Sequence, residues 1–198
     1  MSLQKVKLNA PAYILIILAS IVATGAMRLV SFYFPLFSNF SPLGALSIFG
    51  GAYFADKWKA GLLSVMTLFV TDIFINYLYS AKLVLWYSNS ALWLYGSLLI
   101  MVLIGSMIKK VNVANVALAS LTSVAVHWLL TDIEPWLQSS YYAKGLLGYG
   151  ESLLMAIPFE RNMLLADALF GAILFGGYEF IQARANAKRY AAEKLVVQ

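Results

Sequence analysis

Six long apolar runs constrain the fold of this chain more than any other feature of its sequence. They lie near residues 11–27, 42–56, 60–79, 91–108, 112–131 and 162–183. A helix of about 20 apolar residues crosses the roughly 30 Å hydrocarbon core of a bilayer. Hydrophobic residues make up 62% of the chain and charged residues 12%, whereas soluble domains average about 45–50% apolar and about 25% charged residues. The sequence therefore predicts an all-α, polytopic membrane protein with six transmembrane helices and excludes a soluble monomer.

Two segments depart from this regular pattern. The second run is short and rich in glycine, so we expect it to be tilted or partly re-entrant. Residues 133–158 contain several aromatic side chains and two prolines, which predicts an interfacial loop with a short helix near 151–157. Phe49-Gly50-Gly51 and Phe175-Gly176-Gly177 lie near the ends of the second and sixth runs, where the absent side chains favour close approach of helices.

The basic residues are distributed unevenly between the two predicted sides of the membrane. Six spans place both termini on one side. Ten of the 14 Lys and Arg residues fall on that terminal side, namely Lys5, Lys7, Lys57, Lys59, Lys109, Lys110, Arg184, Lys188, Arg189 and Lys194. The other four are Arg28, Lys82, Lys144 and Arg161. Because basic loops stay in the cytoplasm, we expect cytoplasmic termini, one transmembrane domain over residues 1–183 and a basic cytoplasmic tail over 184–198.

This placement of the basic residues also bears on partners. They flank the apolar runs, where they would contact lipid phosphates, so the net charge of +5 does not indicate a nucleic-acid partner. The lipid bilayer is the partner that the composition predicts.

Polar residues inside the apolar runs gather in the half away from the termini. An ionisable group in hydrocarbon is costly, so each one requires a partner, a cavity or a function. Ser120, Ser123, His127 and Thr131 share one stripe of the fifth run, because about 100° separates successive residues of a helix. The candidate substrate-binding residues are Asp72, Asn76, His127, Thr131 and Asp167. They would form the floor of an outward-facing cavity.

A structural interpretation of the same residues stays open beside this one. Arg28 ends the first run and would form an ion pair with Asp72 or Asp167. The two interpretations are compatible, since an ion pair can also line a cavity.

The sequence contains no catalytic signature. It has no cysteine and one histidine, which excludes thiol chemistry and a site with several histidine ligands. It also lacks the HExxH, GxSxG and Walker patterns. We therefore expect no enzyme activity, no metal site and no resident cofactor, with an intramembrane hydrolase using His127 as a minor alternative. Any coupling to ATP would require a partner.

Several short motifs resemble those of one family. They are Asn39-Phe40-Ser41-Pro42-Leu43-Gly44-Ala45, Phe49-Gly50-Gly51-Ala52-Tyr53-Phe54, Asp72, Ile157-Pro158-Phe159, Arg161-Asn162, Leu165-Ala166-Asp167 and Leu174-Phe175-Gly176-Gly177. Together they resemble an uncharacterised family of small bacterial six-helix membrane proteins over about residues 28–182. That family is itself similar to the S-components of energy-coupling factor transporters, which bind vitamins.

The resemblance implies an S-component-like bundle in the bacterial inner membrane, with cytoplasmic termini. It also implies that a small solute such as a vitamin binds near the outer face under a loop cap. An ATP-driven coupling module would contact the first helix through an AxxxA pattern, and Ala19 and Ala23 have that spacing. Some solitary members bind cobalamin through a cysteine, so in this cysteine-free chain His127 would have to replace it. The alternative function is a structural or assembly subunit of a larger membrane complex.

Overall fold

Helices make up nearly all of the structure, a computed structural model that describes residues 6–7, 9–80 and 90–196. Lys5 and Lys82, which entered the predicted charge distribution, lie outside the described residues, as does the end of the predicted tail at 197–198. Within the described residues there is no strand, and the one β-bridge joins Val6 to Phe54. The predicted all-α class is confirmed.

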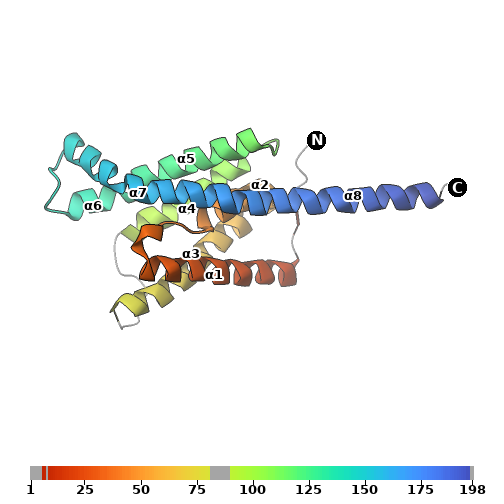
Figure 1. Cartoon of the computed structure of the whole chain (residues 1–198), viewed down its shortest axis with the longest axis horizontal. Helices are drawn as coiled ribbons and strands as arrows, with labels where there is room; N and C mark the ends of the chain where they lie inside the picture. Colours follow the sequence, from red (N-terminus) through yellow and green to blue (C-terminus); the bar gives the residue numbers. More distant parts are fainter. Residues whose placement is uncertain (1–5, 8, 81–89, 197–198) are drawn as a thin grey trace.

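The helices form an elongated bundle with both termini at one end (Figure 1). In chain order they are α1 (Ala10–Tyr33), η1 (Pro35–Phe37), α2 (Leu43–Tyr53), α3 (Lys57–Ser80), α4 (Ser90–Ser106), α5 (Val113–Thr131), α6 (Ile133–Gln138), α7 (Leu146–Gly171), η2 (Ala172–Gly176) and α8 (Gly177–Val196). We call the end of the bundle that holds the termini the terminal end, and the opposite one the distal end. Val6 bonds to the backbone of Tyr53 and Ala55, so α2 ends beside the start of α1 at the terminal end.

Four helical segments are long and apolar enough to cross a membrane. They are Ala10–Tyr33, Lys57–Ser80, Val113–Gln138 and Leu146–Ala187. The other two apolar helices are shorter, since α2 has 11 residues and α4 has 17. At about 1.5 Å per residue, α2 covers roughly half of the hydrocarbon core. These helices indicate that the chain is a membrane protein, and four of the six predicted spans are long enough to cross a bilayer.

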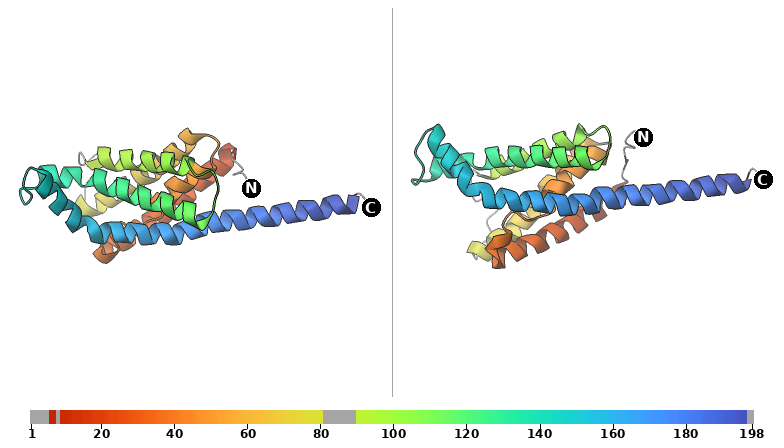
Figure 2. Two further views of the ribbon diagram at one scale, coloured as in Figure 1. Left: turned by 90° about the horizontal axis from the view of Figure 1, so that it is seen from above. Right: turned by 45° about the horizontal axis from the view of Figure 1, so that its top comes forward.

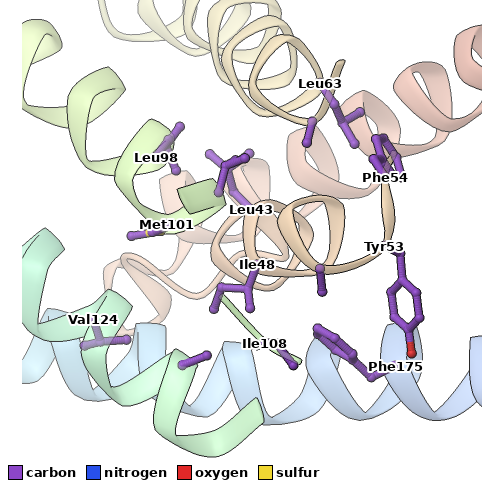
Figure 3. Packing of buried hydrophobic residues seen from close by; sticks show 14 of the residues in the cluster. Leu43, Ile48, Tyr53, Phe54, Leu63, Leu98, Met101, Ile108, Val124 and Phe175 are labelled. Carbon is purple, nitrogen blue, oxygen red and sulfur yellow. The ribbon is translucent and has the colours of Figure 1, made fainter. Parts of the chain in front are cut away.

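The short helix α2 lies at the centre of the bundle, packed against α3, α4 and α7. Ten of its 11 residues are buried, and Figure 3 shows Leu43, Ile48 and Tyr53 among the core side chains. A Cβ at Gly51 would lie 2.1 Å from the Val102 carbonyl oxygen, and one at Gly105 would lie 2.2 Å from that of Ile48. The backbones of α2 and α4 are therefore in direct contact, which requires a glycine on each helix.

The other predicted glycine contact is wrong. Side chains built at Gly176 and Gly177 would meet nothing within 4 Å. The neighbouring Phe175 is buried instead, and its ring packs against those of Phe49 and Tyr53. The aromatic side chain, and not the missing ones, brings this part of the chain against α2.

The predicted loop over residues 133–158 is also wrong for most of its length. The structure has α6, a connection over 139–145, and then α7, which begins at Leu146 and continues through Pro158. Proline removes one backbone bond from a helix, but packing against a neighbouring helix can hold the segment in place. Here the Trp128 indole donates to the Leu153 carbonyl at 2.9 Å, which fastens α7 to α5.

The predicted sixth span, residues 162–183, is part of a much longer helical segment. A π-helical turn, η2, follows α7 directly, and α8 continues to Val196. Figure 2 shows α8 extending past the rest of the bundle at the terminal end. The backbone over most of the predicted basic tail is therefore helical.

Candidate functional site

A cavity of about 250 Å³ lies at the distal end of the bundle. Its wall comes from α1, the segment before α2, the first turn of α2, and helices α3, α4, α5 and α7. The lining residues with polar side-chain groups are Arg28, Ser31, Ser38, Asn39, Ser41, Tyr79 and His127. The helix α2 begins only at Leu43, and residues 38–41 before it form a non-helical segment at the distal end of the bundle. A cavity remains above the first turn of α2.

An ion pair between Arg28 and Asp72 joins α1 to α3 beside this cavity. Arg28 Nη2 lies 2.6 Å from Asp72 Oδ1, and Nη1 donates to Thr71 Oγ1 at 3.1 Å. The Tyr95 hydroxyl of α4 donates to Asp72 Oδ2 at 3.1 Å. Side-chain exposure is 22% for Arg28 and 6% for Asp72. The carboxylate is thus buried behind the guanidinium, which itself reaches the cavity wall.

A second polar pair joins α5 to α7. His127 Nδ1 lies 3.2 Å from both carboxylate oxygens of Glu160, and both residues are buried. With Nδ1 facing Glu160, the other ring nitrogen, Nε2, remains for a further partner. His127 lines the cavity, whereas Glu160 lies outside the lining.

Asp167 of α7 lies deeper, against the first turn of α2. It is 1% exposed, and a Cβ at Gly44 would come within 2.5 Å of its Oδ1. The Ala45 N–H and the Ser120 hydroxyl lie close to this carboxylate, although neither forms a hydrogen bond with it. A carboxylate is favoured at this position because the start of a helix carries partial positive charge.

The turn between α1 and α2 covers the cavity and is fastened on both sides. Asn162 Nδ2 of α7 donates to the carbonyls of Leu36 and Ser38 at 2.6 and 3.0 Å. The Ser31 hydroxyl of α1 bonds to the Phe37 carbonyl at 2.7 Å. Asn39 has a φ of 62°, the left-handed conformation that asparagine tolerates better than most residues. The cavity therefore has a defined rim.

Comparison with known proteins identifies the family of this chain. A model described as "Family of unknown function (DUF6580)" matches residues 8–190. The chain belongs to DUF6580. No curated protein and no solved structure matches it. The match covers every helix that contributes to the cavity of this DUF6580 chain.

Of the five sequence-predicted site residues of the DUF6580 chain, only His127 is among the lining residues of the cavity. His127 lines the cavity, while Asp72 and Asp167 lie behind Arg28 and Gly44 respectively. Asn76 is buried on α3, and the Thr131 hydroxyl donates to the His127 carbonyl at 2.8 Å. Asp72 is the partner of Arg28.

Glu160 is the main residue that sequence reasoning missed. It lies between the predicted loop over residues 133–158 and the predicted sixth run at 162–183, so no helix face was assigned to it. Its spacing of seven residues from Asp167 is the signal that could have placed both carboxylates on one face of a helix. Arg28 was predicted as an ion-pair partner and also lines the cavity.

No cluster of three or more His, Cys, Asp or Glu side chains that could hold a metal is present among residues 6–7, 9–80 and 90–187. Among the described residues of the lining, Arg28 offers a guanidinium and His127 an imidazole to a ligand.

Proposed function

We propose that this chain is a membrane-embedded protein that binds a small solute, such as a vitamin, in the distal cavity for uptake. The observation that carries the proposal is a cavity lined by Arg28 and His127 from two different helices. Polar side chains are costly inside a bilayer unless they face a partner or a cavity. Concave sites with a few polar groups in a mostly apolar wall are typical ligand sites.

We further propose that the protein lies in the bacterial inner membrane with its termini in the cytoplasm. Lys57, Lys109 and Lys110 are close in sequence to the helix ends at the terminal end of the bundle (Figure 1). Arg28, Lys144 and Arg161 belong to the distal half. This distribution agrees with the tendency of basic loops to remain in the cytoplasm. The cavity would then face outward.

Reporter fusions test this orientation. A reporter that is active only in the cytoplasm should work when fused after Gln198 and fail when inserted near Lys144 in the α6–α7 connection. Activity at Lys144 would place the cavity on the cytoplasmic side and contradict uptake from outside.

The similarity to S-components extends the proposal to a coupling partner. Support comes from the six apolar helices, the termini at one end and a cavity at the other under the α1–α2 turn. The sequence has no nucleotide-binding motif, so energy would come from an ATP-driven module or from the solute gradient. We propose neither catalysis nor a resident cofactor.

One observation favours the alternative of a structural or assembly subunit. The Arg28–Asp72 ion pair connects α1 to α3. Only 11% of the residues in the most apolar 18-residue stretch of α1 are buried in the bundle. In a subunit of a larger complex, such a pair would hold α1 in position for a neighbouring protein.

Mass spectrometry of the small molecules released from purified protein distinguishes the two functions. We expect the wild-type protein to release a defined solute. Leu94→Trp should abolish this release, because Leu94 lines the cavity and a larger side chain would fill it. Leu92→Trp on the same helix is the matched control, since Leu92 is 66% exposed. Release of nothing by the wild-type protein, or equal release by both variants, would favour the structural subunit.

A further inference from the structure

The cavity wall presents basic side chains and no acidic one among the described residues. Arg28 and His127 line it, and no Asp or Glu is among the described residues of its lining. The nearby carboxylates of Asp72, Glu160 and Asp167 are all set back behind other residues. A ligand in the cavity would therefore meet nitrogen donors before it met a carboxylate.

Each basic side chain is oriented by the carboxylate behind it. Asp72 forms an ion pair with Arg28 Nη2, and Thr71 accepts a hydrogen bond from Nη1, one of the five N–H groups of the guanidinium. The guanidinium has further N–H groups, and Arg28 lines the cavity. Glu160 similarly fixes Nδ1 of His127, so Nε2 is the nitrogen that can contact a ligand. An imidazole that is protonated offers an N–H at both nitrogens.

These donors would bind a hydrogen-bond acceptor on a ligand, and they would bind an anionic acceptor most strongly. Arginine pairs with carboxylates through two parallel N–H groups, which gives both affinity and geometry. An ammonium group at the same place would face a guanidinium without a carboxylate between them, which is unfavourable in a low dielectric.

The other residues of the wall indicate the chemical character of the part of the ligand that does not contact Arg28 and His127. Much of it is apolar, with Phe32, Phe40, Ile75, Leu94, Leu98 and Met163. The volume of about 250 Å³ is below the roughly 300–1,000 Å³ of sites for drug-sized molecules. The cavity therefore fits a small molecule with an apolar body.

We infer that the cavity selects a small organic carboxylate with an apolar body, and that Arg28 and His127 hold its carboxylate. This assignment rests on the proposed binding function and adds the chemical class of the solute.

Three probes of one shape and different charge test the assignment: 3-phenylpropionate, 3-phenylpropionamide and 3-phenylpropylamine. His127 is the single histidine of the chain, so its imidazole resonances in a histidine-labelled sample report directly on the cavity. We expect the acid to shift these resonances and to bind at least about tenfold more tightly than the amine, which corresponds to about 1.4 kcal/mol.

Two variants connect this preference to the named residues. His127→Gln and Arg28→Lys should each weaken binding of the acid by about fivefold or more, measured by its effect on the melting temperature in detergent. Arg161→Gln is the matched control, because Arg161 is exposed on α7 and outside the lining, and it should leave binding of the acid unchanged.

Binding of the amine as tight as that of the acid would overturn the assignment. Acid binding that survives unchanged in both variants would overturn it too, as would the absence of any effect from the acid. The release experiment with Leu94→Trp is independent of charge. A solute that is released from the wild-type protein but is cationic would contradict this inference and leave the proposed binding function standing.

Discussion

The terminal and distal halves of this bundle are built in opposite ways. In the terminal half, α2 and α4 touch through Gly51 and Gly105, with no room for even one added carbon. In the distal half, the segment before α2 is not helical, and a cavity lined by Arg28 and His127 is present. In one half two helices are in backbone contact, and in the other two polar pairs connect helices beside a cavity.

The difference follows from the length of α2. Its 11 residues fill the bundle from the terminal end to about halfway. Beyond its first turn, α1, α3, α4, α5 and α7 surround the cavity without a central helix between them. The polar pairs Arg28–Asp72 and His127–Glu160 connect the helices there. We therefore expect substitutions in the terminal half to change stability, and those in the distal half to change binding as well.

The largest effect should come from Gly51→Ala. The new methyl group would lie 2.1 Å from the Val102 carbonyl oxygen, so α2 and α4 would have to separate. We expect a loss of about 3 kcal/mol or more, the upper part of the range for overpacked cores. Thermal unfolding in detergent measures the loss.

Gly177→Ala is the matched control for this substitution. A side chain there meets nothing within 4 Å, and alanine favours a helix over glycine by up to about 1 kcal/mol. Its melting temperature should be unchanged or higher. If both variants melt at the same temperature, close backbone contact is not what holds the terminal half together.

A smaller effect should follow from Arg28→Ala in the distal half. Removing one member of a buried ion pair costs about 3–5 kcal/mol. Arg28 is 22% exposed, so we expect about 2–3 kcal/mol. Arg161→Ala, on the exposed face of α7, should cost less than about 0.5 kcal/mol.

The Arg28→Ala/Asp72→Ala double variant distinguishes a pair from two separate contributions. It should lose less stability than the sum of the single variants, because no unpaired charge remains buried. A fully additive double variant would mean that Arg28 stabilises the protein through other contacts, such as the one to Thr71.

The sequence predicted the helical fold because apolar runs report helix position directly. The short second run also carried its own signal, since its glycines and its length both argued against a regular span. The prediction of a 133–158 loop was wrong because it relied on two prolines and on aromatic residues as indicators of an interfacial loop, whereas α6 and α7 cover most of the segment. In the structure, Trp128 and neighbouring helices stabilise that segment, which is a tertiary contact that local sequence does not reveal.

A related error limited the candidate site. Since the sixth span was predicted to begin only at residue 162, Glu160 was not assigned to a helix and the partner of His127 could not be predicted. The cavity depends on which faces of seven separate segments meet, and helical periodicity fixes a face only relative to its own helix. Asp72 and Asp167 are therefore near the cavity without being part of its wall.

The smallest effect concerns the turn that covers the cavity, and it separates the two halves most cleanly. Asn162→Ala removes the donor to the carbonyls of Leu36 and Ser38, which should cost about 1–2 kcal/mol. Hydrogen exchange of the backbone amides of residues 36–41 should become faster, while the amides of α2 keep their protection. The control is Asn115→Ala at the terminal end, where the Asn115 amide donates to the Lys110 carbonyl at 2.8 Å. It removes the same chemical group and should leave exchange of residues 36–41 unchanged. Faster exchange there in both variants would mean that the two halves open together, and the cover of the cavity would then have no stability of its own.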